Sequence, residues 1–272
     1  MHVTEIASAA EAADGTSPLD EATLLTLAHH PERVRTWTRD GGFALVIGDE
    51  LTLVVHPDHR NHRIGTALLD DVLADTTTAL SAWSHTDHPA AARLARSHGF
   101  ENVRALWVMR RDLTGPLPEM DVPDGIEIRG FRPGDEDEVV RVNAAAFVDH
   151  PEQGAMDRAN LAQRMAQPWF DPEGLLLATR QGNDHTLLGL HWTKHHPDAF
   201  GEVYVVGIDP AAQGGGLGKV LTLAGLHHLK QRGATEVILY VESDNAPAIA
   251  VYSRLGFGHS ASDTHVMYRR AL

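Results

Sequence analysis

Four glycines occupy a five-residue segment of this 272-residue chain, Gly214 to Gly218, between an apolar run and an amphipathic helical pattern. Glycine lets the backbone approach a ligand closely. The free N–H groups and the dipole of a helix N-terminus attract anions. The segment therefore predicts a cradle for a phosphate or diphosphate, built from main-chain atoms.

Two common nucleotide-binding loops do not fit this segment. A Walker A loop needs glycine where the chain has Gln213, and a magnesium-binding hydroxyl where it has Val220. A dinucleotide-binding Gly-x-Gly-x-x-Gly fingerprint that starts at Gly214 needs glycine at Lys219. The expected anion therefore belongs to another kind of cofactor.

The amino-acid composition argues against nucleic-acid-binding, membrane-spanning and secreted proteins. The formal charge of −14 argues against nucleic-acid binding, which needs a basic surface. No apolar run reaches the roughly 20 residues that span a bilayer, and residues 1–5 do not resemble a secretion signal. We expect a cytoplasmic monomer without membrane contact.

The side chains that bind metals or form disulfides are limited. The chain has no cysteine, which excludes disulfides, thiolate metal sites and cysteine nucleophiles. Its 18 histidines show no His-Glu-x-x-His spacing, so we expect surface or polar-network histidines and no metal.

An internal repeat divides the sequence. Residues 53–73 align with residues 206–226, and "ARSHGF" ending at Phe100 aligns with "YSRLGF" ending at Phe257. One repeat of this length indicates a duplicated domain. The segment after residue 113 is rich in proline and glycine. We predict domains over residues 1–113 and 125–272, joined by a linker over 114–124.

Apolar periodicity predicts a mixed α/β fold in both halves. In the C-terminal half, strands are expected over 126–129, 175–179, 186–193, 202–208, 237–241 and 265–268, and helices over 135–147, 161–165, 217–232 and 246–255. In the N-terminal half, helices are expected near 19–27, 64–73 and 90–96, a hairpin near 43–55, and strands over 80–83 and 102–109.

The glycine segment with its flanking strand and helix resembles the acetyl-CoA-binding motif of the GNAT superfamily of N-acetyltransferases. Gln213, Gly216 and Gly218 occupy the motif Gln/Arg-x-x-Gly-x-Gly/Ala, after a strand that ends in Ile-x-Pro. The resemblance implies two tandem GNAT-like domains, each with a mixed, mostly antiparallel sheet flanked by helices. It implies acetyl-CoA as cosubstrate, bound by Val206, Gly207, Ile208, Gln213, Gly214, Gly215, Gly216, Leu217, Gly218, Lys219 and Asn245. The alternative is a tight turn without a ligand.

Two residues are predicted to move protons. "LYVESDNAPAIAVYSRLGF" resembles the closing segment of the superfamily and places Tyr252 where a phenol would protonate the departing CoA thiolate. Glu202, at the start of the cofactor strand, could take a proton through water, because only a neutral amine is nucleophilic. The alternatives are a buried helix tyrosine and a solvated surface charge.

The N-terminal repeat departs from the motif. Arg63 stands where the other half has Gly216, and no tyrosine corresponds to Tyr252. A side chain there would crowd a diphosphate unless the loop shifts, although Arg63 itself could pair with a phosphate. We expect a half without chemistry, structural or holding a second cofactor at Leu53, Val54, Val55, Arg60, Arg63, Gly65 and Thr66.

Longer strings such as "GEVYVVGIDPAAQGGGLGK" are similar to the mycothiol synthases, actinobacterial tandem GNAT enzymes. The resemblance implies transfer of acetyl to the cysteinyl amine of cysteinyl-glucosaminyl-inositol, a small amino-thiol pseudodisaccharide. It implies substrate contacts from Glu21, Glu152, Lys194, Glu202 and Tyr240. The alternatives are a GNAT enzyme for another amine, such as an aminoglycoside or a protein N-terminus, and an acetyl-CoA sensor without catalysis.

Overall fold

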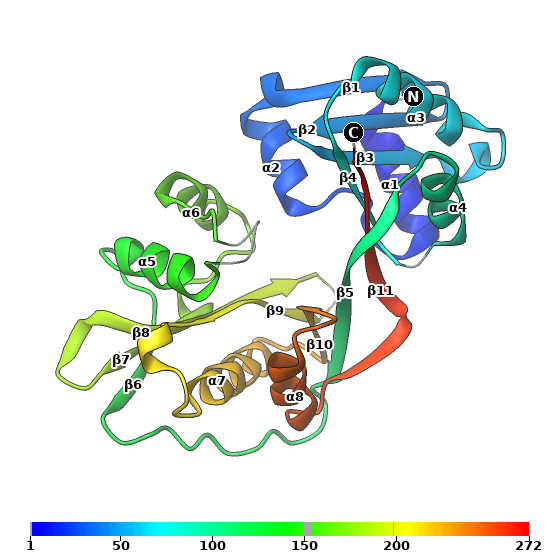
Figure 1. Ribbon diagram of the computed structural model, residues 1–272. Helices are drawn as coiled ribbons and strands as arrows, with labels where there is room; N and C mark the ends of the chain where they lie inside the picture. Colours follow the sequence, from blue (N-terminus) through cyan, green and yellow to red (C-terminus); the bar gives the residue numbers. More distant parts are fainter. Residues whose placement is uncertain (1, 87, 149–153, 198, 272) are drawn as a thin grey trace. The chain divides into compact units, whose positions relative to one another are not determined.

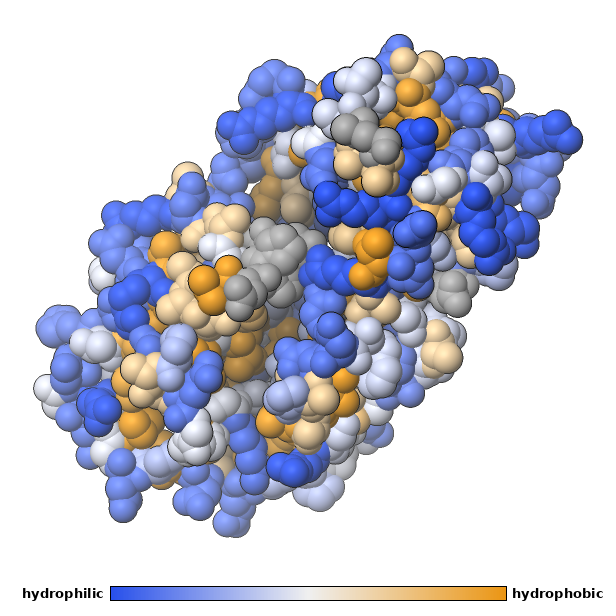
Figure 2. Space-filling view, viewed as in Figure 1, coloured by the Kyte–Doolittle hydropathy of each residue, from blue (hydrophilic) through white to orange (hydrophobic). Residues whose placement is uncertain are grey.

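The chain divides into two compact units, each built from strands and helices (Figure 1). The computed structural model describes residues 2–86, 88–148, 154–197 and 199–271. The N-terminal unit comprises residues 1–107 and 260–272, and the C-terminal unit comprises residues 108–259. On the face shown in Figure 2, hydrophilic side chains predominate over both units, in keeping with the high net charge.

The N-terminal unit has a mixed sheet between helices. Its strand order is β1-β2-β3-β4-β11-β5, antiparallel except for the parallel pair β3–β4 among the pairings described. The strands are β1 (Val34–Arg39), β2 (Gly42–Ile47), β3 (Glu50–Val55), β4 (Leu80–Ser84), β5 (Glu101–Asp112) and β11 (Gly258–Arg270). The helices are α1 (Val3–Asp14), α2 (Glu21–His29), α3 (Ile64–Asp75) and α4 (Pro89–Ser97), with 3-10 turns at Pro31–Arg33 and Pro57–His59.

Strand β2 forms the centre of this unit because it is buried on both faces. Ala44 and Val46 pack in one apolar cluster with Leu68 of α3, whereas Phe43 packs in a second cluster with Ile6 of α1. Successive side chains of a strand point to opposite faces. Helices α1 and α3 therefore cover opposite faces of the sheet.

The C-terminal unit repeats this plan with the strand order β5-β10-β9-β8-β7-β6. Its strands are β6 (Ile126–Gly130), β7 (Leu175–Arg180), β8 (Asn183–His196), β9 (Phe200–Ile208) and β10 (Glu236–Glu242). Its helices are α5 (Glu136–Ala146), α6 (Arg158–Met165), α7 (Leu217–Gln231) and α8 (Ala246–Arg254), with 3-10 turns at Pro172–Gly174 and Pro210–Ala212. Helices α5 and α7 lie on opposite sides of β8 and β9 (Figure 1).

The last strand differs from the sequence-based domain boundary. Residues 260–272 were expected in the C-terminal domain, but they belong to the N-terminal unit. Residues 266–270 of β11 pair antiparallel with β4, and Val266 and Tyr268 are buried in the cluster around α3. The predicted linker has neither helix nor strand, yet it lies in the C-terminal unit, where the N–H of the preceding Leu113 donates to the carbonyl of Thr235.

Each sheet opens between its two parallel strands. The β9–β10 pairs end at Val203 and Leu239, although β9 continues to Ile208 and β10 to Glu242. Strands β3 and β4 likewise pair at Glu50 and Ser81 and then continue without further recorded pairs. Ligands of open α/β sheets bind beyond the carboxyl ends of parallel strands. In each unit, the strand ends beyond these pairs lie on the side of the loop and the crossover helix that follow β3 or β9.

Candidate functional site

The glycine segment forms an exposed loop between β9 and α7. Gly214 and Gly216 adopt left-handed backbone angles, φ 88° and 78°. A Cβ added at Gly214, Gly215 or Gly216 would meet no described atom within 4 Å. No side chain of the described chain caps α7, so the N–H groups of its first turn are not covered by a cap. The loop fits the diphosphate cradle expected from the sequence.

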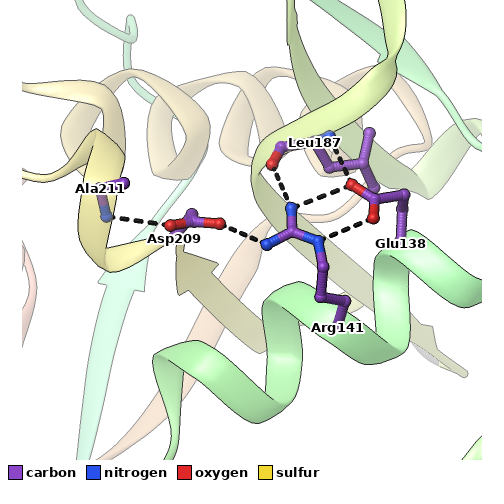
Figure 3. Close-up of polar contacts among 5 residues, drawn as sticks. All are labelled: Glu138, Arg141, Leu187, Asp209 and Ala211. Atoms are coloured by element: carbon purple, nitrogen blue, oxygen red, sulfur yellow. Dashed lines mark hydrogen bonds and ion pairs between the residues drawn. The ribbon is translucent and has the colours of Figure 1, made fainter.

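An arginine holds the turn that leads into this loop (Figure 3). Arg141 of α5 donates to the Asp209 carboxylate at 2.5 Å and to both Glu138 oxygens at 2.7 and 2.9 Å. It also donates to the carbonyl of Leu187 at 2.8 Å. The other Asp209 oxygen accepts the N–H of Ala211 at 2.9 Å and so closes the 3-10 turn. The end of β9 is therefore tied to α5 and β8.

The charges of this network stabilise one another. The Arg141 guanidinium lowers the pKa of Glu138 and of Asp209, and the two carboxylates raise the pKa of the arginine. Sequence reasoning missed Arg141. It stands 68 residues before Asp209, and only the packing of α5 on the sheet brings the two together.

Tyr252 lies on α8, the helix after β10. Its ring packs against Phe257 at 5.9 Å between centroids, and burial raises its pKa to about 12. The phenol therefore keeps its proton at neutral pH, as a proton donor must. Asn245 is the N-cap of the same helix, and its side-chain oxygen accepts the N–H of Ala248 at 3.1 Å. Its cofactor contact remains a prediction.

Glu202 of β9 lies in a group of polar side chains from β8, β9 and β10. It is 8% exposed, and its carboxylate lies 2.7 Å from Nε2 of His196, a residue that sequence reasoning did not single out. Lys194 is its cross-strand neighbour. Partial desolvation and the charge of Glu202 raise the pKa of Tyr240, although the residue is 44% exposed. The structure thus brings together three of the predicted substrate residues in the C-terminal unit.

The lysine of this group lies against aromatic rings. The ammonium of Lys194 stands 4.7 Å from the ring centroid of Trp169 and 5.2 Å from that of Tyr204. Such cation–π contacts orient the side chain.

The other two predicted substrate residues are not part of this group. Glu21 is the first residue of α2 in the N-terminal unit, and Glu152 lies outside the described residues. Their roles remain predictions.

The N-terminal loop keeps the backbone of its counterpart without the glycines. Asn61 and Arg63, which align with Gly214 and Gly216, adopt φ angles of 67° and 62°. The two loops therefore share the left-handed backbone at both of these positions. Arg60 is held by Asp14 through two hydrogen bonds of 2.7 Å and donates to the carbonyl of Val55 at 3.2 Å.

A cavity of about 810 Å³ opens beside this loop, within the N-terminal unit. Its lining includes all seven residues of the predicted second cofactor site: Leu53, Val54, Val55, Arg60, Arg63, Gly65 and Thr66. Ala95, which aligns with Tyr252, lines it as well. A ligand-binding cleft typically measures about 300–1,000 Å³.

The described part of the chain has neither a metal-binding cluster nor a membrane-spanning helix. No group of three or more His, Cys, Asp or Glu side chains could hold a metal ion there. No helix in that part has the length and apolar character to cross a membrane.

Two family models match the chain, one in each unit. Residues 27–102 match an "Acetyltransferase (GNAT) domain", and residues 141–257 match the "Acetyltransferase (GNAT) family". A mycothiol acetyltransferase from Nocardioides sp. is 64% identical over 98% of this chain and 96% of that protein. The chain belongs to the mycothiol acetyltransferase family. Another mycothiol acetyltransferase, from Thermomonospora curvata, is 49% identical over 98% of the chain and 92% of that protein.

Solved structures show the same fold. A tandem GNAT protein from the clavulanic acid biosynthesis pathway aligns with a TM-score of 0.70 and 18% identity, over 99% of this chain and 96% of that one. A GCN5-related N-acetyltransferase from Sphaerobacter thermophilus aligns with a TM-score of 0.69 and 22% identity, over 99% of this chain and 91% of that one. The expected class of two tandem GNAT domains is confirmed. The expectation that the protein is an N-acetyltransferase is also confirmed.

Proposed function

We propose that the C-terminal unit transfers the acetyl group of acetyl-CoA to the cysteinyl amine of desacetylmycothiol, the last step of mycothiol biosynthesis. The observation that carries this proposal is the 64% identity to a mycothiol acetyltransferase over nearly the whole chain. The glycine loop, Glu202 and Tyr252 lie in this unit, where residues 141–257 match the GNAT family model.

The loop and the separated strands suit the two parts of CoA. Main-chain N–H groups from Gln213 to Lys219 would bind the diphosphate without a basic surface. The edge of β9 from Val206 to Ile208, beyond its last recorded pair with β10, would hydrogen-bond the pantetheine arm. The bound cosubstrate supplies an activated acetyl thioester.

Glu202 would prepare the acceptor. An amine is protonated at neutral pH, and only its neutral form attacks a carbonyl. The carboxylate would take one ammonium proton through a water molecule. Lys194 and Tyr240, with Glu21 and Glu152, would hold the hydroxyl-rich sugar and inositol through hydrogen bonds.

The remaining steps form a carbon–nitrogen bond, break the carbon–sulfur bond and move two protons. The amine nitrogen bonds to the acetyl carbon while backbone N–H groups near Val206 stabilise the charge on the carbonyl oxygen. The carbon–sulfur bond then breaks as the carbonyl re-forms, and Tyr252 protonates the departing thiolate. The nitrogen loses its second proton through water, and that proton restores the phenol of Tyr252. The raised pKa of Tyr252 keeps that proton available at neutral pH.

An assay of CoA thiol release with a panel of amines tests the proposal. We expect the highest kcat/KM with cysteinyl-glucosaminyl-inositol, well above aminoglycosides and peptide N-termini. A higher value for another amine would replace the acceptor, and acetyl-CoA binding without turnover of any amine would indicate a sensor.

We propose in addition that the N-terminal unit binds acetyl-CoA without chemistry. The cavity of about 810 Å³, lined by Arg60 and Arg63, favours an anionic ligand there, and Ala95 provides no proton donor. Calorimetric titration should show two acetyl-CoA sites per chain. The Arg63→Glu variant should lose the N-terminal site, and a single site in the wild type would contradict this proposal.

A further inference from the structure

The carboxylate of Glu202 has one described side-chain hydrogen-bond partner, and the proposed mechanism does not use it. Nε2 of His196 lies 2.7 Å from Oε2 of Glu202. Both belong to the C-terminal unit, on neighbouring antiparallel strands. The histidine side chain is 30% exposed and the glutamate side chain 11%, so the imidazole stands on the more solvated side of the pair.

The strand register fixes this contact. Lys194 pairs with Glu202 and His196 pairs with Phe200, so the histidine and the glutamate are diagonal neighbours on one face of the sheet. The imidazole also packs on the Phe200 ring, with 5.3 Å between centroids. Packing and hydrogen bonding together limit the rotation of the histidine ring.

We infer that His196 is a positioning residue for acetyl transfer: its imidazole holds Oε2 of Glu202, so that Oε1 is the oxygen that receives the amine proton. This inference rests on the proposed function. In the step, one N–H bond of the ammonium breaks, and its proton passes through water to Oε1. No covalent bond of His196 changes.

Two variants and a matched control test the inference. H196A removes the hydrogen bond, and kcat/KM for the cysteinyl acceptor should fall about 10–100-fold with an unchanged KM for acetyl-CoA. H196Q keeps an N–H donor that does not titrate. It should therefore recover most of the rate that H196A loses, with the same KM for acetyl-CoA.

His195 is the control because it lies next in the strand but on the opposite face. Its cross-strand partner Gly201 faces Leu229 of α7. H195Q should keep the wild-type rate. Thermal melting of every variant shows whether it is folded, and H196Q is the deciding variant should H196A unfold.

The outcomes separate the inference from the proposed function. A wild-type kcat/KM in H196A, or a folded H196Q as slow as H196A, overturns the inference while the proposed function stands. If the wild-type chain does not acetylate the cysteinyl acceptor at all, the proposed function fails and the inference fails with it.

Discussion

The two loops that follow β3 and β9 share left-handed backbone angles at two positions but differ in their side chains. The C-terminal loop has glycine at both left-handed positions, 214 and 216, whereas the N-terminal loop holds the same angles with Asn61 and Arg63. A left-handed L-residue costs roughly 1–2 kcal/mol relative to glycine. The fold has kept this shape in the N-terminal unit despite that cost, so the shape alone does not identify the catalytic unit.

The side chains around the two loops differ. Tyr252 in one unit aligns with Ala95 in the other, where a cavity of about 810 Å³ lies. The C-terminal loop offers main-chain N–H groups, and the N-terminal loop adds two arginines. The comparison separates the anion binding that we propose for both units from the proton donation that we propose for Tyr252.

The largest expected effect concerns that tyrosine. Tyr252→Phe removes the proton donor and should lower kcat by about 10–10⁴-fold with little change in KM, measured by thiol release. Phenylalanine keeps the ring contact with Phe257, so the fold should be unaffected. Unchanged turnover would exclude Tyr252 from the mechanism.

Alanine substitutions at two neighbouring glycines test how much the left-handed angle costs in the C-terminal loop. Gly216→Ala should lower the free energy of unfolding by roughly 1–2 kcal/mol, because Gly216 has a φ of 78°. Gly215→Ala is the matched control, since an added Cβ has similar open space at both positions but Gly215 lacks a positive φ. Urea denaturation measures both, and equal losses would show that the left-handed angle carries no cost.

The arginine network predicts a pH-dependent stability. Arg141→Gln should cost about 1 kcal/mol at neutral pH, a small value because Arg141 is partly exposed. The pKa values of Glu138 and Asp209 are lowered in the folded state, so their stabilisation is present above the unfolded pKa near 4 and is lost as pH falls. Denaturation from pH 7 to pH 3 should bring wild type and variant together, and a constant gap would contradict this account.

The smallest expected effect concerns the ion pair of Arg60 with Asp14 in the N-terminal unit. Asp14 holds Arg60 with two hydrogen bonds, in the place where a diphosphate would compete for the guanidinium. Asp14→Asn should therefore tighten acetyl-CoA binding at the N-terminal site by about 2–10-fold, because one charged competitor is lost. Calorimetry measures this change, and weaker binding would show that Asp14 positions Arg60 instead.

Local sequence patterns predicted many of the elements that carry the site. The apolar strand before the glycines and the helix after them correspond to β9 and α7, because each has a clear period. Helix α1 was missed, since its buried face includes the small residues Ala7 and Ala10. Strand β11 is longer than the predicted 265–268, because its early residues are mostly exposed and lack an apolar alternation.

Contacts between distant segments could not be predicted. The sequence indicated Glu202 through a family resemblance, but its pairing with His196 depends on the register of β8 and β9. The contact of Arg141 with Asp209 depends on how α5 packs. The placement of residues 260–272 in the N-terminal unit follows from pairing with β4, which no local pattern encodes.

The most direct measurement is mass spectrometry of cysteinyl-glucosaminyl-inositol after incubation with the wild-type chain and acetyl-CoA. The account predicts one acetyl group on the cysteinyl nitrogen for each CoA thiol released, and a much slower appearance of that product with Tyr252→Phe. An unmodified acceptor, or equal rates for the two proteins, would contradict it.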